Sequence, residues 1–435
     1  MPESKIKNFY IHTFGCSLNK ADSILMRNLV EKLGYKYTND LRCAEYVIVN
    51  TCTVKNLTLK KVLKYLRETK SLKDKKLIIA GCLTYNEELL NKEFEDIPRI
   101  KPQEIHKILE YLSKDSQINI VEDKYSLPLI TESRIVQIPI NDGCASFCTF
   151  CATKLARPQL RSFSEERILA NLKQALLNNA YEIQLTSQDS GAYGLDRKTN
   201  LINLLEKIEK LIKNFNDKNF RIRLGMMNPV HLKNFYVELA DILKTNDYFY
   251  SFLHIPIQSG SNMVLEHMLR KNTVEEFIDI VKYLRKNVKD IFIMTDVIVG
   301  YPTEKESDFE QTLEMLKVVK PETTNVSKYS AMPKTYAATL KQIPKGEIER
   351  RSKITAKLCK EIEHNARKKY VNSISKVFVT EKNKTITGRL QNYIQVALPS
   401  LNESYLGTFV NAKIISLKYI TLFAEPVVEK RLSAI

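Results

Sequence analysis

Three cysteines stand close together in the middle of the chain, at Cys144, Cys148 and Cys151. They directly follow a predicted strand, Ile135–Asn141, so they share one short loop. Three thiolates on such a loop hold three corners of a cubane iron–sulfur cluster and leave its fourth iron open to a small molecule. Structural zinc is the main alternative, but it commonly takes four ligands, and no fourth Cys or His stands near this loop. A chance group of buried thiols is the other alternative.

Three further cysteines are far apart in the sequence but share one setting. Each comes just after a predicted strand: Cys16 after Asn8–Thr13, Cys52 after Tyr46–Asn50, and Cys82 after Lys76–Ala80. The carboxyl ends of strands in an open α/β sheet meet at one crevice, so we expect these thiols to lie together. Gly15 and Gly81 precede two of them and allow tight turns beside a bulky ligand. Spacing alone leaves two interpretations of these cysteines open: a shared metal site, or three unrelated thiols in the core.

Composition and charge limit the functional classes. The chain has 435 residues, 67 Lys and Arg against 50 Asp and Glu, and a formal net charge of +17. Ten of those net positive charges lie between Lys341 and the C-terminus, which favours a polyanionic partner such as nucleic acid over a merely solvated basic surface. No apolar run is long enough to span a membrane, and the first residues lack the apolar core of a signal peptide. We therefore expect a cytoplasmic protein whose eight cysteines serve metals or catalysis rather than disulfides.

The elements that must position these residues fall into successive regions. Short apolar runs alternate with amphipathic stretches up to about Tyr125, which predicts a parallel sheet covered by helices. The segment Glu122–Ser133 reads as a linker. Six candidate strands then alternate with helical patterns, which suits an incomplete barrel or a doubly wound sheet; periodicity does not separate the two. These strands are Ile135–Asn141, Tyr181–Ser187, Phe220–Met226, Tyr250–Ile257, Ile291–Val299 and Thr324–Tyr329.

A long helix and a small β-domain are expected at the end of the chain. The helix is predicted over Glu347–Tyr370, and its basic face Arg350–Lys369 is a candidate extension of a nucleic-acid groove. Its apolar positions recur at helical spacing: Ile348, Ile354, Leu358, Ile362 and Ala366. Five short strands after Ser373 suggest a small antiparallel barrel of a size that often binds RNA. The predicted domains are therefore 1–125, 130–346, a linker helix at 347–372, and 373–435.

Several motifs together resemble the methylthiotransferase family of the radical S-adenosylmethionine (SAM) superfamily. The cysteine loop with Phe150 before its last cysteine resembles the superfamily. The family resemblance is carried by Gly15–Asn19, Asn50–Cys52, Ala80–Cys82, Ser187–Gly191, His254–Ser261 and Asp296–Glu304. It spans nearly the whole chain, and it implies an α/β fold with three parts. These are an N-terminal open parallel α/β sheet domain, a central radical-SAM partial (β/α)6 barrel, and a small C-terminal antiparallel β-barrel of the TRAM type.

The sequences that follow Cys52 and Cys151 look most like the archaeal and eukaryotic branch of the family. The resemblance implies 2-methylthiolation of N6-threonylcarbamoyladenosine beside the tRNA anticodon. Sister branches act on N6-isopentenyladenosine of tRNA or on an aspartate of a ribosomal protein, and the basic tail favours tRNA over a small protein. The chain departs from the family pattern at Met332-Pro333-Lys334-Thr335, where Arg-Pro-Gly-Thr is commoner, so this loop bears on the nucleoside assignment. A non-catalytic iron–sulfur RNA-binding protein is the alternative from another class.

The resemblance also implies the cofactors and partners. Two 4Fe–4S clusters are expected, one on Cys144, Cys148 and Cys151, where SAM is cleaved, and one on Cys16, Cys52 and Cys82, which holds or delivers sulfur. The expected partners are the anticodon stem-loop of tRNA, SAM, and an electron donor of the flavodoxin or ferredoxin type, with no membrane.

Two further groups of side chains are candidates for ligand contact. Residues at strand ends are expected to bind SAM, although solvated strand-end polar groups are the alternative. These residues are Gln188 and Asp189 for the amino group, Arg223 for the carboxylate, Gln258 and Ser259 for the ribose, and the Val297–Gly300 backbone, with Val299, for the adenine. In the C-terminal strands, Arg389, Asn392 and Tyr393 offer a cation, an amide and an aromatic ring on one expected exposed hairpin. Such a trio can grip phosphate and stack on a base, or it is an ordinary solvated hairpin.

Overall fold

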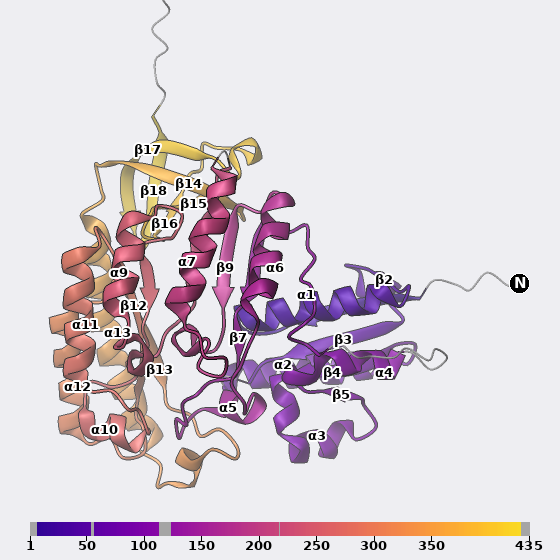
Figure 1. Ribbon diagram of the computed structural model, residues 1–435. Helices are drawn as coiled ribbons and strands as arrows, with labels where there is room; N and C mark the ends of the chain where they lie inside the picture. Colours follow the sequence, from indigo (N-terminus) through magenta and orange to yellow (C-terminus); the bar gives the residue numbers. More distant parts are fainter. Residues whose placement is uncertain (1–6, 54–55, 113–122, 217, 428–435) are drawn as a thin grey trace, which may run out of the picture. The chain divides into compact units, whose positions relative to one another are not determined.

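The computed structural model describes residues 7–53, 56–112, 123–216 and 218–427 (Figure 1). Val54, Lys55 and Glu122 of the segments considered above lie outside these residues. Two compact units make up the chain. Unit 1 consists of Met1–Asn179, Gln184–Ile208 and Ser330–Leu340, and unit 2 of Ala180–Ile183, Glu209–Tyr329 and Lys341–Ile435.

Unit 1 opens with a five-stranded parallel sheet in the order β2-β1-β3-β4-β5. Its strands are β1 (Asn8–Thr13), β2 (Lys36–Tyr37), β3 (Tyr46–Thr51), β4 (Lys76–Gly81) and β5 (Arg99–Ile100). The helices between them are α1 (Ser17–Lys32), α2 (Asn56–Lys70), α3 (Glu87–Phe94) and α4 (Ile108–Leu112). β3 is buried along its whole length, as expected for a parallel strand covered on both faces. The predicted N-terminal α/β sheet is confirmed.

The rest of unit 1 carries the cysteine loop. Its elements are β6 (Ile135–Pro139), β7 (Asn141–Asp142), α5 (Ala152–Ala156), β8 (Arg161–Ser162) and α6 (Glu165–Leu177). The expectation that Glu122–Ser133, which precedes β6, is a linker is wrong. Four of its side chains are buried: Lys124, Tyr125, Leu127 and Leu129. Apolar residues at Tyr125, Leu127 and Leu129 alternate with exposed or half-buried ones, so this segment packs into the unit although it forms no element.

β9 (Glu182–Thr186) contributes to both units, since its first residues belong to unit 2 and its last to unit 1. α7 (Leu201–Ile212) likewise begins in unit 1 and ends in unit 2. In unit 1 the Ile140 N–H donates to the carbonyl of Thr186, and in unit 2 the Arg221 N–H donates to the carbonyl of Tyr181. The remaining strands of unit 2 are β10 (Arg221–Arg223), β11 (Phe252–His254), β12 (Phe292–Val299) and β13 (Thr323–Lys328), and β11, β12 and β13 pair in parallel. Their helices are α8 (Pro229–Leu232), α9 (Tyr236–Thr245), α10 (Asn262–His267), α11 (Val274–Asn287) and α12 (Glu306–Val319).

The long helix α13 (Lys345–Lys368) packs against β13, but not with the face that the apolar pattern predicts. Its buried stripe is polar and recurs every four residues: Arg351, Thr355, Cys359, Glu363 and Arg367. Ile354, which the pattern places on the buried face, is 39% exposed. The buried polar groups have partners instead of water. The Glu363 carboxylate accepts the Thr324 N–H at 2.9 Å, and Arg367 donates to the carbonyl of Glu322 at 2.7 Å.

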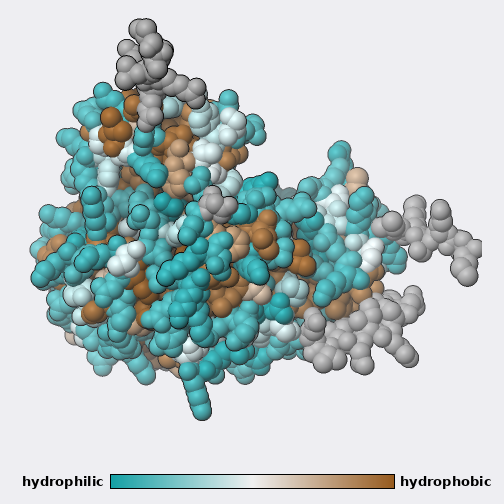
Figure 2. Space-filling model, turned by 45° about the horizontal axis from the view of Figure 1, so that its top comes forward, coloured by the Kyte–Doolittle hydropathy of each residue, from teal (hydrophilic) through white to brown (hydrophobic). Residues whose placement is uncertain are grey.

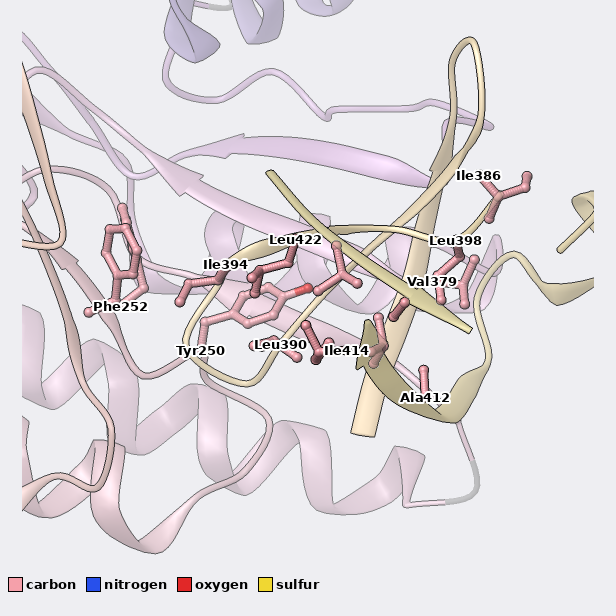
Figure 3. Close-up of a cluster of buried hydrophobic side chains, with 14 residues drawn as sticks. Tyr250, Phe252, Val379, Ile386, Leu390, Ile394, Leu398, Ala412, Ile414 and Leu422 are labelled. Atoms are coloured by element: carbon pink, nitrogen blue, oxygen red, sulfur yellow. The ribbon is translucent and has the colours of Figure 1, made fainter. Parts of the chain in front are cut away.

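The C-terminal strands close into a five-stranded barrel in the order β14-β15-β16-β18-β17, at the top of Figure 1. They are β14 (Ile374–Lys382), β15 (Ile386–Arg389), β16 (Gln395–Ala397), β17 (Phe409–Lys418) and β18 (Thr421–Pro426). Tyr250 and Phe252 from β11 and its approach belong to the same apolar cluster as the barrel interior. Figure 3 shows the Tyr250 ring beside Leu390, Ile394 and Leu422. The predicted five-stranded barrel is confirmed, but it is not wholly antiparallel, because β16 and β18 pair in parallel. Its core is continuous with the strands of unit 2.

Within the described part of the chain, helices of sufficient length lack the apolar character that crossing a membrane requires.

Candidate iron–sulfur site

The first triad is Cys144, Cys148 and Cys151, and its loop begins at a turn that only glycine accommodates. Gly143 follows β7 with φ +73°, and a Cβ there would stand 1.9 Å from the carbonyl oxygen of Gln159. Its N–H donates to the side-chain oxygen of Gln188 at 2.8 Å. The loop is thus tied at its first residue to the segment that follows β9.

The three cysteines of this loop are half-buried and lie among backbone donors. The Cys144 sulfur accepts the Ser146 N–H at 3.3 Å, and the Cys151 N–H donates to the carbonyl of Cys148 at 3.1 Å. Lys154 on α5 donates to the carbonyl of Cys144 at 2.6 Å. Its ammonium also lies 4.3 Å from the centre of the Phe147 ring, which is 67% exposed. Lys154 therefore connects the start of the loop to its one strongly exposed aromatic ring, while the cysteines themselves are partly buried.

Gln188 and Asp189 lie beside the first triad, as the sequence predicts for residues at the end of β9. The Asp189 carboxylate is 4.0 Å from the Cys144 sulfur and accepts the Gly191 N–H at 3.1 Å. The Asp189 carbonyl accepts from the Asn141 side chain at 3.1 Å. Burial and the Asp189 charge together raise the pKa of Cys144 to about 12. Contact of Gln188 and Asp189 with SAM stays a prediction.

The loop that departs from the family pattern also belongs to unit 1. The Ala337 N–H, two residues after Thr335, donates to the carbonyl of Thr149 in the cysteine loop at 3.0 Å. Thr335 is buried, and its hydroxyl donates to the carbonyl of Met332 at 2.7 Å. Lys334 is exposed and has φ +64°. The segment that follows Met332–Thr335 is therefore hydrogen-bonded to the loop of the first triad.

The second triad, which is Cys16, Cys52 and Cys82, comes together at the carboxyl end of the N-terminal sheet. Cys16 directly precedes α1, Cys52 directly follows β3, and Cys82 begins the short 3-10 helix η2 (Cys82–Tyr85) after β4. Gly15 has φ +108°, and a Cβ on it would stand 2.7 Å from the Cys52 Cβ. Burial is the main cause that raises the pKa of Cys82 to about 12; the nearby Arg157 charge opposes this rise, and the thiols of Cys16 and Cys52 add to it. The expectation that these cysteines meet in space is therefore met.

Both triads offer the donor set of an iron–sulfur cluster, and their role as its ligands stays a prediction. The donor atoms are thiols, the ligands that iron–sulfur clusters prefer. Among the residues that the structure describes, no three His, Cys, Asp or Glu side chains gather as tightly as one metal ion demands. In the second triad, a side chain at Gly15 would stand 2.9 Å from the Cys52 sulfur, so the glycine keeps that side of the sulfur free of a side chain.

Four buried charges that sequence reasoning missed form a closed ring inside unit 1. Arg157, which ends α5, lies 2.5 Å from Asp22 of α1 and 2.7 Å from Asp142 of β7. Lys124 lies 2.6 Å from Asp22 and 2.5 Å from Asp142. All four side chains are at most 1% exposed. Burial favours a neutral Asp142 carboxyl, but Arg157 and Lys124 outweigh it and lower its pKa. The two cations therefore favour the charged form of Asp142.

The other candidate SAM residues belong to unit 2. The Arg223 guanidinium lies 5.0 Å from the centre of the Phe252 ring and 5.1 Å from that of Tyr393. Gln258 has φ +79°, and its backbone pairs with β12. Ser259 is fully buried, and its hydroxyl accepts the Ser261 N–H at 3.2 Å, so it supports a turn. The Val299 carbonyl accepts the Tyr329 N–H at 2.8 Å. Contact of these four residues with SAM stays a prediction.

Unit 2 also contains a polar line across three strands. His254 on β11 lies 2.8 Å from the Asp296 carboxylate on β12, and that carboxylate accepts from Asn325 on β13 at 2.6 Å. His254 is therefore a strand residue that is hydrogen-bonded to a neighbouring carboxylate.

The expectation of an exposed RNA-binding hairpin at Arg389, Asn392 and Tyr393 is wrong. Asn392 is buried, and its amide donates to the Tyr370 hydroxyl at 2.7 Å. The Tyr393 hydroxyl donates to Glu182 at 3.2 Å, and its ring packs on Tyr250. Arg389 is paired with Glu381 at 3.0 Å, and its side chain is 16% exposed. The physical reason is that this hairpin closes the barrel onto β11, where an aromatic ring gains more from burial than from water.

Comparison with known proteins gives the family. A model described as "Radical SAM superfamily" matches residues 138–316, and one described as "Uncharacterized protein family UPF0004" matches residues 8–99. A "Probable threonylcarbamoyladenosine tRNA methylthiotransferase" of Pyrococcus horikoshii is 35% identical, covering 93% of this chain and 96% of that protein. That of Archaeoglobus fulgidus is 34% identical over 97% and 99%, and the human "Threonylcarbamoyladenosine tRNA methylthiotransferase" is 31% identical over 94% and 72%.

The fold has known relatives as well. The radical S-adenosylmethionine methyltransferase TsrM of Kitasatospora setae, solved with cobalamin and a 4Fe–4S cluster, matches with a TM-score of 0.57. The match covers 77% of each chain at 13% identity, and so it concerns the fold alone. With relatives at 30–35% identity over most of its length, the chain belongs to the radical SAM family of threonylcarbamoyladenosine tRNA methylthiotransferases.

Proposed function

We propose that this chain methylthiolates C2 of N6-threonylcarbamoyladenosine beside the anticodon of tRNA. The observation that carries the proposal is the full-length similarity to relatives whose names state this substrate, 35% over 93% of the chain for the Pyrococcus horikoshii protein. The presence of both cysteine triads in one compact unit supports it, because sulfur insertion needs a radical source and a sulfur site close together.

The reaction explains why two triads are needed. Acid–base catalysis cannot replace the hydrogen at an unactivated purine carbon by sulfur, so a cofactor must supply the reactive species. When bound, two SAM molecules and two 4Fe–4S clusters supply a 5′-deoxyadenosyl radical, sulfur and a methyl group. The chain's part is to hold the first cluster on Cys144, Cys148 and Cys151, and the second on Cys16, Cys52 and Cys82. Gln188 and Asp189, which contact the loop of the first triad, are the residues that we propose for the polar groups of SAM.

The exposed face of the barrel is the surface that we propose for tRNA, in place of the buried hairpin. Lys376 on β14 pairs in register with Asn411 on β17, and Lys413 stands two residues further along β17, all exposed. At the tip of the β17–β18 hairpin, Lys418 is followed by Tyr419, which is 92% exposed with φ +57°. Figure 2 shows apolar side chains among polar ones on this lobe. Cations for phosphate beside a ring for stacking are what single-stranded RNA needs.

The first test is nucleoside mass spectrometry of tRNA from the native cells with the gene deleted, and after return of wild type or Cys148→Ala. We expect the 2-methylthio derivative of threonylcarbamoyladenosine to vanish, to return with wild type and to stay absent with the variant. Equal methylthiolation with and without the gene would contradict the substrate. A loss confined to N6-isopentenyladenosine, or to an aspartate of a ribosomal protein, would favour a sister branch.

The second test separates an enzyme from a non-catalytic RNA-binding protein. Anaerobically reconstituted protein is given reductant and SAM, and 5′-deoxyadenosine is measured. An enzyme of this class releases it, whereas a pure binder releases none. We propose a flavodoxin- or ferredoxin-type donor in the cytoplasm as the natural reductant, and replacing dithionite by each protein in this assay tests that.

A further inference from the structure

The ring Asp22–Arg157–Asp142–Lys124 joins the two cysteine triads through short links of chain. Asp142 is two residues before Cys144, and Arg157 directly follows α5, the helix that begins after Cys151. Asp22 belongs to α1, the helix that begins after Cys16. In addition, α5 packs against η2, the 3-10 helix that begins with Cys82. The charged ring thus clamps both ends of the first loop to the helix that follows one ligand of the second triad.

Arg157 reaches beyond the ring to the second triad itself. Its second guanidinium nitrogen donates to the Asn19 side-chain oxygen at 3.0 Å, and that same oxygen lies 3.8 Å from the Cys82 sulfur. The Asn19 amide nitrogen donates to two carbonyls, that of Phe14 at 2.9 Å and that of Thr51 at 2.8 Å. Thr51 directly precedes Cys52, and Phe14 stands two residues before Cys16. One asparagine therefore touches the approach to each of the three second-triad cysteines.

We propose that Arg157 and Asn19 are positioning residues that fix the second cysteine triad beside the first, so that sulfur transfer stays coupled to SAM cleavage. The inference rests on the proposed function, but it concerns residues that lie behind the second triad and outside the set expected to bind SAM or tRNA. Arg157 suits this role because its planar fork bonds two carboxylates and an amide at once, which a lysine ammonium cannot do with the same directions. Groups that orient metal ligands from behind typically change function by about 10- to 100-fold when altered.

A ring that served stability alone would predict something different. Its loss would reduce cluster content, SAM cleavage and methylthiolation together, in proportion to the folded protein remaining. A positioning role instead separates the two reactions, because each triad still holds its own cluster while the spacing between them changes. A shift of about 1 Å between reacting groups can cost roughly 100-fold in rate. The ratio of methylthiolated product to 5′-deoxyadenosine therefore distinguishes the two roles.

The test uses the full-length reconstituted enzyme and the variants Arg157→Lys and Asn19→Ala. Arg367→Lys is the matched control, a buried arginine of α13 that donates to the carbonyl of Glu322 in unit 2. We expect both test variants to keep about eight iron atoms per chain, the content of two cubanes. SAM cleavage should stay within about twofold, while product per 5′-deoxyadenosine falls about tenfold or more. The control should keep the wild-type ratio.

A spectroscopic readout checks the geometry without turnover. In the doubly reduced enzyme, the electron paramagnetic resonance spectrum contains the magnetic interaction between the two clusters, which depends on their separation. We expect this interaction to change in Arg157→Lys and Asn19→Ala and to persist in Arg367→Lys. A wild-type product ratio together with a wild-type interaction in Asn19→Ala would overturn the proposal. So would a parallel loss of iron, cleavage and product in both test variants, while total absence of SAM cleavage in the wild type would instead count against the proposed function.

Discussion

At the scale of single residues, the two triads should fail in different ways when one thiol is removed. Cys148→Ala leaves two thiolates at the first site, so it should lose about four of the eight iron atoms and all SAM cleavage. Cys52→Ala should lose a similar amount of iron, keep SAM cleavage and eliminate sulfur insertion. Anaerobic iron, sulfide, 5′-deoxyadenosine and nucleoside analyses check both. Methylthiolation retained by Cys52→Ala would contradict the role of the second triad, and Cys43→Ala, at an exposed cysteine outside both triads, is the control.

Lys334 stores backbone strain at the loop beside the first triad. It has φ +64° at the position where the family pattern has glycine, and a side chain in that region costs about 1 kcal/mol. Lys334→Gly should therefore raise the melting temperature by a few degrees or leave it unchanged, while removing an exposed cation. If that cation contacts tRNA, the KM for tRNA rises and the rate at saturation stays. A fall in thermal stability would contradict the strain, and Lys320→Gly, at φ +48° on the C-terminus of α12, is the matched control.

The residue scale also shows what a sequence can and cannot reveal. Cys16, Cys52 and Cys82 were placed together correctly because each follows a strand of one parallel sheet, so local pattern and topology agree. Arg157 and Lys124 carry no such signal. A lysine or arginine in a polar stretch is normally solvated, and only the folded chain shows that two aspartates more than 100 residues apart enclose them.

At the scale of elements, α13 packs by ion pairs where its apolar period predicts aliphatic contact. Arg351, on the buried stripe, lies 3.0 Å from Glu304 and 2.7 Å from Glu347. Its removal leaves the buried Glu304 carboxylate without its cation, and such losses cost about 3 to 5 kcal/mol. Arg351→Met should therefore lower the thermal unfolding midpoint of unit 2 clearly.

The neighbouring Arg350 provides the control for that prediction. It pairs with Glu306 and Glu347, but its side chain is 44% exposed, and exposed pairs contribute at most about 1 kcal/mol. Arg350→Met should therefore melt close to wild type. Equal midpoints for the two variants would mean that the buried stripe does not hold α13. The sequence missed this stripe because periodicity counts apolar residues and gives no weight to buried pairs.

The strands, in contrast, were predicted closely. The six central strands fall within or beside the expected ranges, and five strands form after Ser373 as expected, because short β-branched runs bounded by turn residues are a local signal. The sequence pattern did not reveal which way the side chains of a turn face. It identified the turn between β15 and β16 but could not tell that Tyr393 packs on Tyr250 rather than facing water, since that contact joins residues far apart in sequence.

At the scale of the whole molecule, the net charge of +17 makes tRNA binding depend on salt, and the position of each cation decides its share. Lys413 is exposed on the outer face of β17, so Lys413→Ala should lower the slope of log K against log salt by about 1. Arg389 is engaged with Glu381 and the Tyr393 ring, so Arg389→Ala should leave that slope unchanged. Tyr419→Ala should weaken binding by about 1 to 3 kcal/mol at every salt concentration, because stacking involves no released counterion. A changed slope for Arg389→Ala together with an unchanged one for Lys413→Ala would move the tRNA surface from the outer face of the barrel to its inner hairpin.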